Sequence, residues 1–583
     1  MLLIGRCYNE RMKTKIYIIY DKYFKNSIGL GFLIALSTVL GYTLGEKQRT
    51  FRSLSEFGLM VVQVILLTVF TSFVIKLLLK FMTRLRDSEV KTRVGQKEYH
   101  GWQVFLFYTG VIFLFWLPVF LAYYPSVFAY DAEGQLYQVL ANDYSTHHPL
   151  IHTLFLGAFF NLGGNVLGSY SAGMAVHSIV QMLLMAMIFG YTLMVLYQEK
   201  TSCVMRFILL AFYAIFPTNS ILAISTTKDV LFSGLVLLFV IKMYQWSRGI
   251  SGNRIGFAIA FLSISVLMLL FRNNAVYAYV VSLPFVFLLW RKNAESVRNR
   301  NQNVKSVIMR GVCAVLATLL LFVVCSAGLK QMTSAYNGSP REMLSVPLQQ
   351  MARTRVHHEE EIDAAMRTEL DSYISSEWVF AAYNPYLADP VKSRAVIHDN
   401  PVGLIKTWVK LGTQFPMTYI DAFLDNSIGY WYLADKSHST IYGVGTESGF
   451  GYLSTDNRTM PAGCEIIEHS YLPGLRVFME KIVSDNEYQK IPVLSVIFAP
   501  AFYWWLLCLY IVFFFKRKEY KMLLPVVFLV MYYLTLLLSP TVLIRYMYPF
   551  VVSVPVMLCL TSAKRCDIVE NTCENTQEVL KND

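Results

Sequence analysis

The most constraining feature of this sequence is a series of long apolar runs separated by short basic loops. A helix that crosses the hydrocarbon core of a bilayer needs about 20 predominantly apolar residues. Of the 583 residues, 55% are hydrophobic and only 15% are charged, which is too apolar for an ordinary soluble domain. The sequence therefore predicts a mainly α-helical, polytopic membrane protein. We predict spans at 28–44, 57–79, 103–123, 173–197, 206–224, 229–247, 255–271, 275–290, 310–328, 491–514, 522–539 and 545–562.

One further apolar run, residues 150–168, decides the sidedness of everything that follows it. If this run does not span, the basic loops all lie on one side of the membrane, as the positive-inside rule requires. If it does span, the loop 291–310 faces outward instead. We therefore predict a re-entrant or surface-lying helix at 150–168 and about twelve spans. The protein is expected in the plasma membrane, with both termini in the cytoplasm. This topology explains the net charge of +12 without a nucleic-acid partner.

The same topology places four polar pieces on the outer face: the stretch 123–152, the turns 225–229 and 272–274, and a long segment from 329 to 490. That segment is long enough to fold around a core of its own. We expect five parts along the chain. Residues 1–102 form a cytoplasmic lead with two extra spans, and residues 103–328 form a transmembrane core whose outer loop is 124–172. An extracytoplasmic domain (329–490), the last three spans (491–562) and a disordered cytoplasmic tail (563–583) follow.

The polar stretch YYPSVFAYDAEGQLYQVLANDYSTHHPLIH begins at Tyr123 and holds the first candidate site residues. Asp131 and Gln135 begin a polar row at helical spacing, beside an apolar row, which predicts an amphipathic helix at a membrane surface. Asp131 and Glu133 could serve as a general base or bind a hard divalent cation. A surface helix also needs polar residues for solvation alone. The two acids, two residues apart, do not share a helix face, so we expect Asp131 to act without Glu133.

Two adjacent histidines, His147 and His148, follow this helix and precede Pro149. An imidazole could coordinate a metal or hydrogen-bond a phosphate or a sugar hydroxyl. The alternative is that the pair caps the next helix.

Three cations from three different loops fall at the same predicted membrane level. They are Lys228, next to Asp229; Arg272, next to Asn273; and Arg545, next to Tyr546. Each one alone is explained by a side chain that reaches from a helix end to the interface. Together they are suited to hold a lipid-linked phosphate, because both side-chain types donate to phosphoryl oxygens.

The extracytoplasmic segment contains SVPLQQMART, in which Gln349, Gln350 and Arg353 could reach glycan hydroxyls or a phosphate. An exposed helix face explains these residues equally well.

The order of the short motifs YP..F.YD...Q, STHHPL, TKD, RNN, PLQQ.AR and R..YP resembles that of the GT-C superfamily of integral membrane glycosyltransferases, and in particular a bacterial group of GT-C-like proteins. The resemblance covers about Gln103 to Leu560. It implies a GT-C-like helix arrangement and transfer of a sugar from a polyprenyl-phosphate donor to a cell-surface glycan, lipid or protein outside the membrane. It also implies Asp131 as the catalytic base of an inverting displacement, and Lys228, Arg272 and Arg545 as ligands of the donor phosphate.

The remaining polar residues are expected to contact substrate. These are Glu133, Gln135, His147, His148, Asp229, Asn273, Gln349, Gln350, Arg353 and Tyr546. Whether Asp131 and His148 bind a divalent cation, Mg²⁺ or Mn²⁺, stays open. Many GT-C members have a clearer acidic pair in this loop than this sequence has.

Three rival functions remain at this stage. A polymerase or ligase would move a whole lipid-linked glycan, and a transporter or flippase would place ionisable groups near the middle of the membrane. A non-catalytic glycan-binding membrane protein would need no Asp131 in a cavity. The sequence contains no Walker A loop, GxSxG elbow, HExxH motif or dinucleotide fingerprint.

Overall fold

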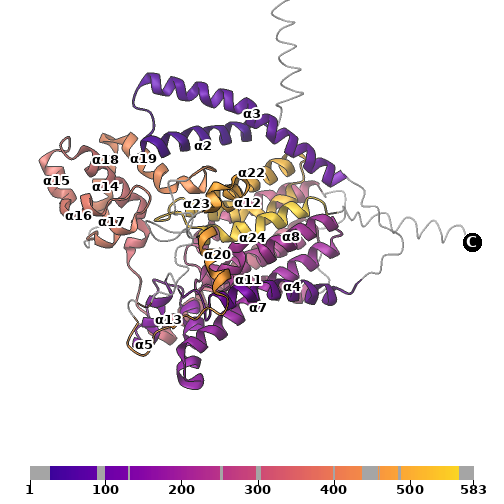
Figure 1. The fold of residues 1–583 in the computed structure, drawn as a ribbon. Coiled ribbons are helices and arrows are strands. Elements are labelled where there is room, and N and C mark those ends of the chain that lie inside the picture. The colour runs from indigo at the N-terminus through magenta and orange to yellow at the C-terminus, as the bar shows by residue number, and fades with distance from the viewer. Residues whose placement is uncertain are drawn as a thin grey trace, which may run out of the picture.

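The computed structural model describes residues 27–87, 99–128, 131–249, 254–296, 304–397, 401–435, 457, 460–483 and 487–563. These residues form helices and no strand (Figure 1). The apolar helices are α2 (Ile28–Lys47), α3 (Leu54–Asp87), α4 (Gly101–Ala122), α6 (Leu150–Leu162), α7 (Tyr170–Gln198), α8 (Cys203–Ile215), α9 (Pro217–Ala223), α10 (Asp229–Arg248), α11 (Arg254–Phe271), α12 (Ala275–Ser296), α13 (Val304–Thr333), α21 (Pro492–Phe498), α22 (Pro500–Lys516), α23 (Val527–Leu536) and α24 (Ile544–Leu560).

The other helices are shorter and mostly more polar. They are α5 (Ala132–Ala141), the π-helical turn η2 (Gly163–Leu167), η3 (Pro340–Leu344), α14 (Ser345–His358), α15 (Ala364–Asp371), α16 (Ser376–Ala382), α17 (Asp389–Arg394), α18 (Pro401–Gln414), α19 (Pro416–Ser427), η4 (Ile428–Tyr430), α20 (Pro473–Val483), η6 (Glu487–Lys490) and η7 (Tyr520–Val526).

Eight helices of the described chain are long and apolar enough to cross a membrane, or up to ten if α8–α9 and α21–α22 each form one bent span. The twelve predicted spans are therefore not all confirmed. Three of them coincide with shorter apolar stretches, at 275–289, 520–536 and 544–560. One of the eight is α6 with η2, at the segment where the charge pattern predicted a re-entrant or surface helix. The predicted disordered tail lies outside the described residues, apart from its first residue.

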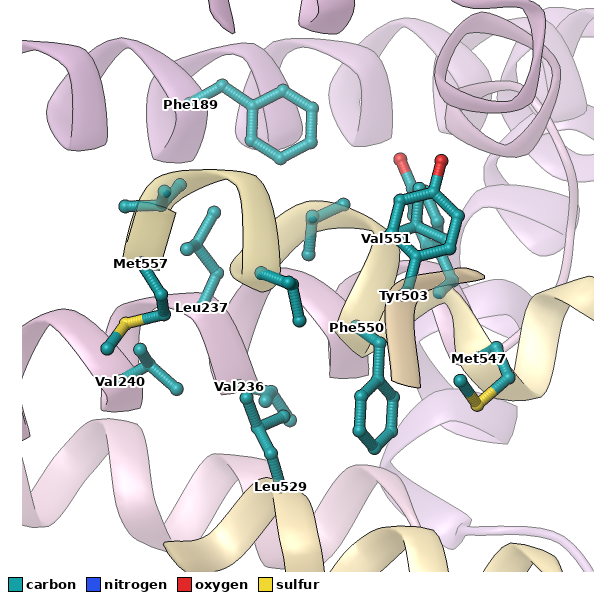
Figure 2. Packing of buried hydrophobic residues seen from close by; sticks show 14 of the residues in the cluster. Phe189, Val236, Leu237, Val240, Tyr503, Leu529, Met547, Phe550, Val551 and Met557 are labelled. Carbon is teal, nitrogen blue, oxygen red and sulfur yellow. The ribbon is translucent and has the colours of Figure 1, made fainter. Parts of the chain in front are cut away.

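The centre of the bundle is formed by α10 and α24. Fourteen of the 17 residues of α24 are buried, so this helix is enclosed on nearly every side. Figure 2 shows Phe550, Val551 and Met557 of α24 in the same buried cluster as Val236, Leu237 and Val240 of α10. The first residues of these two central helices lie at the candidate site described below.

Glycine allows two helix pairs to approach closely. A Cβ atom on Gly190 of α7 would lie 2.2 Å from Oγ1 of Thr109 in α4. A Cβ atom on Gly31 of α2 would lie 2.2 Å from Oγ of Ser72 in α3. Any side chain at either position would therefore push the two helices apart.

A separate helical domain, which we call the polar domain, comprises η3 and α14–α19 (340–427) (Figure 1). It has its own apolar core, which includes Leu348, Met351 and Leu411. The sequence led us to expect such a core within the segment 329–490, and these helices form one part of that segment. The later part of the segment lies against the bundle instead, since the amide of His469 donates to the carbonyl of Tyr124 at 2.9 Å.

The hairpin of α2 and α3 is attached to the rest of the molecule at both of its ends. At one end, Asp421 of the polar domain accepts hydrogen bonds from the amide of Thr50 at 3.0 Å and from its hydroxyl at 2.7 Å. At the other end, Arg86 pairs with Glu519 at 2.8 Å. The polar domain also joins the loop before α24, where the Asn426 amide donates to the carbonyl of Ser539 at 2.8 Å. The polar domain and the start of α24 therefore lie at the same end of the bundle.

Candidate functional site

Five charged side chains meet where four distant chain segments come together. We call Asp131, Lys228, Asp229, Arg272 and Arg545 the ion cluster. Asp131 is the N-cap residue of α5, Lys228 and Asp229 begin α10, Arg272 follows α11, and Arg545 lies in the first turn of α24. The predicted helix at α5 is confirmed, and the sequence-predicted carboxylate and cations are brought together in one place.

Asp131 is the point on which the cations converge. Its Oδ2 atom accepts a short hydrogen bond from the Lys228 ammonium and lies 3.5 Å from Nη1 of Arg545. Nδ1 of His148 lies 3.9 Å from the same oxygen and 3.2 Å from the Lys228 ammonium nitrogen. The ammonium therefore contacts both the carboxylate and the imidazole.

Asp229 forms a second, deeper layer. Its Oδ1 atom pairs closely with Arg272, and its Oδ2 atom lies 3.2 Å from Nη1 of Arg545. The Thr227 hydroxyl donates to Oδ2 at 3.1 Å. The Arg272 guanidinium also lies 4.7 Å from the ring centroid of Tyr546, in cation–π geometry. Asp229 thus compensates two buried guanidinium groups, an arrangement that a buried charge requires.

Exposure decreases from one layer to the next. The Asp131 side chain is 30% exposed, whereas those of Lys228, His148 and Arg545 are 15%, 12% and 8% exposed. The Asp229 side chain is 1% exposed. A molecule that approaches the cluster from solvent therefore meets Asp131 first.

Burial and charge both act on the ionisation of this site. Burial raises the pKa of the Asp131 carboxyl, but Lys228 and Arg545 outweigh it and hold that pKa well below its ordinary value. Burial, with the nearby Lys228 cation, lowers the pKa of His148 to about 3. Burial also lowers the pKa of Lys228, although Asp131 opposes this shift. At neutral pH, Asp131 is charged and His148 is neutral.

Backbone pairing brings the Asp131 segment and the Lys228 segment together. The amide of Val127 donates to the carbonyl of Ile224 at 3.1 Å, and Thr226 donates back to the carbonyl of Val127 at 3.1 Å. Gln181 of α7 donates to the carbonyls of Ala223 at 3.0 Å and Ser225 at 2.7 Å. Sequence reasoning missed Gln181, whose one signal is an amide side chain inside an apolar helix.

Asn273 and Gln135, expected to contact substrate, hold other parts of the site in place. The Asn273 amide donates to the carbonyls of Thr146 at 3.1 Å and His147 at 3.4 Å, which fixes the loop that presents His148. The Gln135 amide lies 3.1 Å from Nδ1 of His152 and 3.0 Å from the Thr153 hydroxyl, which joins α5 to α6.

Tyr546, Glu133 and His147 lie at the edge of the cluster or close to it in the chain. The Tyr546 hydroxyl accepts from Nη2 of Arg545 at 3.4 Å. Glu133 is half-buried in the first turn of α5. His147 is 40% exposed, lies 3.9 Å from Glu342 and stacks edge-on against His148.

Gln349, Gln350 and Arg353 lie within the polar domain and are not brought to the ion cluster. Arg353 pairs with Asp425 at 2.6 Å and donates to the carbonyl of Gln48 in the α2–α3 turn. Gln350 donates to the carbonyl of Tyr419 at 3.1 Å, and Gln349 donates to a backbone carbonyl. These three side chains are buried and join elements of the structure to one another.

A divalent cation does not fit the pair Asp131 and His148. The Lys228 ammonium already contacts both the carboxylate and the imidazole, and Arg545 adds a second positive charge beside it. Across the described ranges, no group of three or more His, Cys, Asp or Glu side chains converges on a common point.

The fold and the cluster define a multi-pass helical membrane protein with a charged site at one end of its bundle. The chain belongs to DUF6020, a family of unknown function, whose model matches residues 142–575. The matched region contains Lys228, Asp229, Arg272 and Arg545, whereas Asp131 precedes it. Comparisons with curated proteins and with solved structures gave no match.

Proposed function

We propose that this protein is a membrane glycosyltransferase of the GT-C type, which moves a sugar from a polyprenyl-phosphate donor to an extracytoplasmic glycan, lipid or protein. The main support is the ion cluster, in which a partly exposed carboxylate lies over two cations, Lys228 and Arg545. A phosphate needs such cations, and an acceptor hydroxyl needs such a carboxylate.

The proposed reaction is a single inverting displacement at the anomeric carbon. The acceptor oxygen forms the new bond to this carbon as its proton passes to the Asp131 carboxylate. The bond between the anomeric carbon and the phosphate oxygen breaks, and its electron pair stays on the polyprenyl phosphate. Lys228 and Arg545 stabilise the charge that grows on that leaving group.

Arg272 has a different role in this proposal from the one expected of it. Its guanidinium pairs with Asp229 and faces the Tyr546 ring, and Asp229 in turn pairs with Arg545. Arg272 therefore acts on Arg545 through Asp229. We assign donor-phosphate contact to Lys228 and Arg545, and a positioning role to Arg272.

The location of the charges favours transfer over transport. Lys228 precedes α10, Arg272 follows α11, and Arg545 lies in the first turn of α24. A transport pathway is marked by ionisable groups near mid-membrane, whereas these groups lie at helix ends. On the predicted topology, this end faces the outside of the cell, where lipid-linked sugars replace nucleotide sugars as donors.

The test is sugar transfer by purified protein in lipid nanodiscs, with labelled polyprenyl-monophosphate sugar and isolated cell-envelope acceptors. We expect Asp131→Asn to lower the transfer rate by about 10²- to 10⁴-fold, the contribution of a well-placed base. Asp143→Asn is the matched control, because Asp143 is an exposed carboxylate just after α5. Transfer by Asp131→Asn at the wild-type rate would refute the assignment of the base. Transfer from diphosphate-linked oligosaccharides alone would show a ligase or polymerase instead.

A further inference from the structure

In this structure Asp131 occupies the place that an external anion would take. One oxygen, Oδ2, receives the Lys228 ammonium and lies 3.5 Å from the Arg545 guanidinium. These are the two cations assigned to the donor phosphate. Both are less exposed to solvent than Asp131, which is the most exposed member of the cluster. A phosphate oxygen and Oδ2 cannot both occupy this position.

We propose that Asp131 is the exchangeable counter-ion of an anion site formed by Lys228 and Arg545, and that a phosphodiester displaces it on binding. This inference rests on the proposed function and deepens it, since binding of the donor frees the carboxylate that then acts as base.

Asp131 is the carboxylate of the cluster that is free to leave. Although it is the N-cap residue of α5, its side chain makes no capping hydrogen bond to the described part of that helix. Asp229, by contrast, is held by Arg272, Arg545 and the Thr227 hydroxyl, and its side chain is 1% exposed. Asp229 therefore keeps Arg545 in position while Asp131 moves.

The charge of the cluster fits a phosphodiester. Lys228, Arg272 and Arg545 exceed the two carboxylates by one positive charge, and His148 is neutral. A sugar linked to a polyprenol through one phosphate is a singly charged phosphodiester, so its binding neutralises the cluster. A diphosphate linkage would leave an excess of negative charge beside Asp131.

Exchange also removes an obstacle to catalysis. A carboxylate paired with two cations is a weak base, because the cations stabilise its charged form. Once the phosphodiester holds Lys228 and Arg545, this stabilisation is lost and the carboxylate becomes more basic. The acceptor hydroxyl is then deprotonated only when a donor is in place.

The test is calorimetric binding of a soluble prenyl methyl phosphodiester, with no sugar and no acceptor present. We expect Asp131→Asn to bind this probe about three- to tenfold more tightly than the wild type, because the internal competitor has lost its charge. Asp143→Asn, which removes the same charge from a nearby exposed position, should bind as the wild type does. Unchanged or weaker binding by Asp131→Asn would overturn the exchange.

A second measurement needs only the wild-type protein. At about pH 4.5, in buffers that differ in ionisation enthalpy, probe binding should be accompanied by uptake of part of a proton as Asp131 is released from its cations. The phosphodiester itself takes up none. Binding with no proton uptake would also overturn the exchange.

These outcomes are separable from failure of the proposed function. Tighter binding by Asp131→Asn in a protein that transfers no sugar would support the anion site and refute the transferase. Transfer by the wild type with unchanged binding by Asp131→Asn would support the transferase and refute the exchange.

Discussion

At the scale of single residues, the two carboxylates of the ion cluster differ in environment more than in chemistry. Asp131 is partly exposed and has mainly Lys228 as its close partner, whereas Asp229 is fully buried between two arginines. A buried charge that loses its partner costs far more than an exposed one, because the remaining charge stays out of water. Removing the charge of Asp131 is therefore expected to affect activity and anion binding, whereas removing that of Asp229 is expected to affect stability.

Asp229→Asn should destabilise the protein, because it leaves Arg272 and Arg545 without their shared counter-ion. The expected loss is about 3–5 kcal/mol, which is typical of a broken buried ion pair. It would be measured as a fall in the melting temperature in detergent. The control is Asp143→Asn, whose carboxylate is exposed just after α5, so its effect should be within about 0.5 kcal/mol. Equal melting temperatures for the two variants would contradict the structural role of Asp229.

His148 should make stability depend on pH. Burial lowers the pKa of this imidazole to about 3 in the folded protein, against an ordinary value of 6.5. Between these two values the unfolded chain binds a proton that the folded chain does not, so stability falls as the pH drops from 6.5 towards 3. His148→Gln should flatten the slope of melting temperature against pH in this window. His147→Gln, at the more exposed neighbour, is the control. The same slope in His148→Gln and in the wild type would rule out this origin.

At the scale of elements, the site depends on contacts between helices that are remote in sequence. Gln181 of α7 holds the segment before Lys228, and Asn273 holds the histidine loop. The hairpin α2–α3 lies outside the family match at 142–575, yet its turn is joined to the polar domain through Asp421 and Arg353. This junction fastens the α2–α3 hairpin to the region that the family model matches.

Asp421→Asn should loosen that junction without unfolding the bundle. Asp421 is fully buried and accepts two hydrogen bonds from Thr50, besides pairing with Arg52. We expect amide hydrogen exchange in residues 48–53 to become about tenfold faster, because a charge-assisted contact is lost. Exchange in α24 should stay as in the wild type. Unchanged exchange at 48–53 would show that the hairpin is held by its apolar contacts instead.

At the scale of the whole molecule, the ion cluster, the polar domain and the α2–α3 turn are linked at one end of the bundle. The opposite end contains the pair of Arg86 and Glu519. The predicted topology, with the basic loops inside the cell, would place the cluster on the outer face.

Single cysteines in a background without the nine native cysteines test this sidedness. Ser55→Cys in the α2–α3 hairpin and Thr368→Cys in the polar domain should react with a membrane-impermeant maleimide on intact cells. Lys518→Cys, in the exposed loop after α22, should react only after the cells are opened. Labelling of Lys518→Cys on intact cells would overturn the predicted topology and the outward-facing site.

The sequence by itself determined the helical membrane fold and most of the predicted spans, because burial in lipid requires long apolar runs that are read locally. It also determined the helix at α5 and the candidates Asp131, Lys228 and Arg545. Only the tertiary structure decided how these charges pair and that Asp229 and Arg272 are buried more deeply than Asp131. It also decided that Arg353 joins the polar domain to the α2–α3 turn. Pairing depends on which loops meet in space, and no local periodicity encodes that meeting.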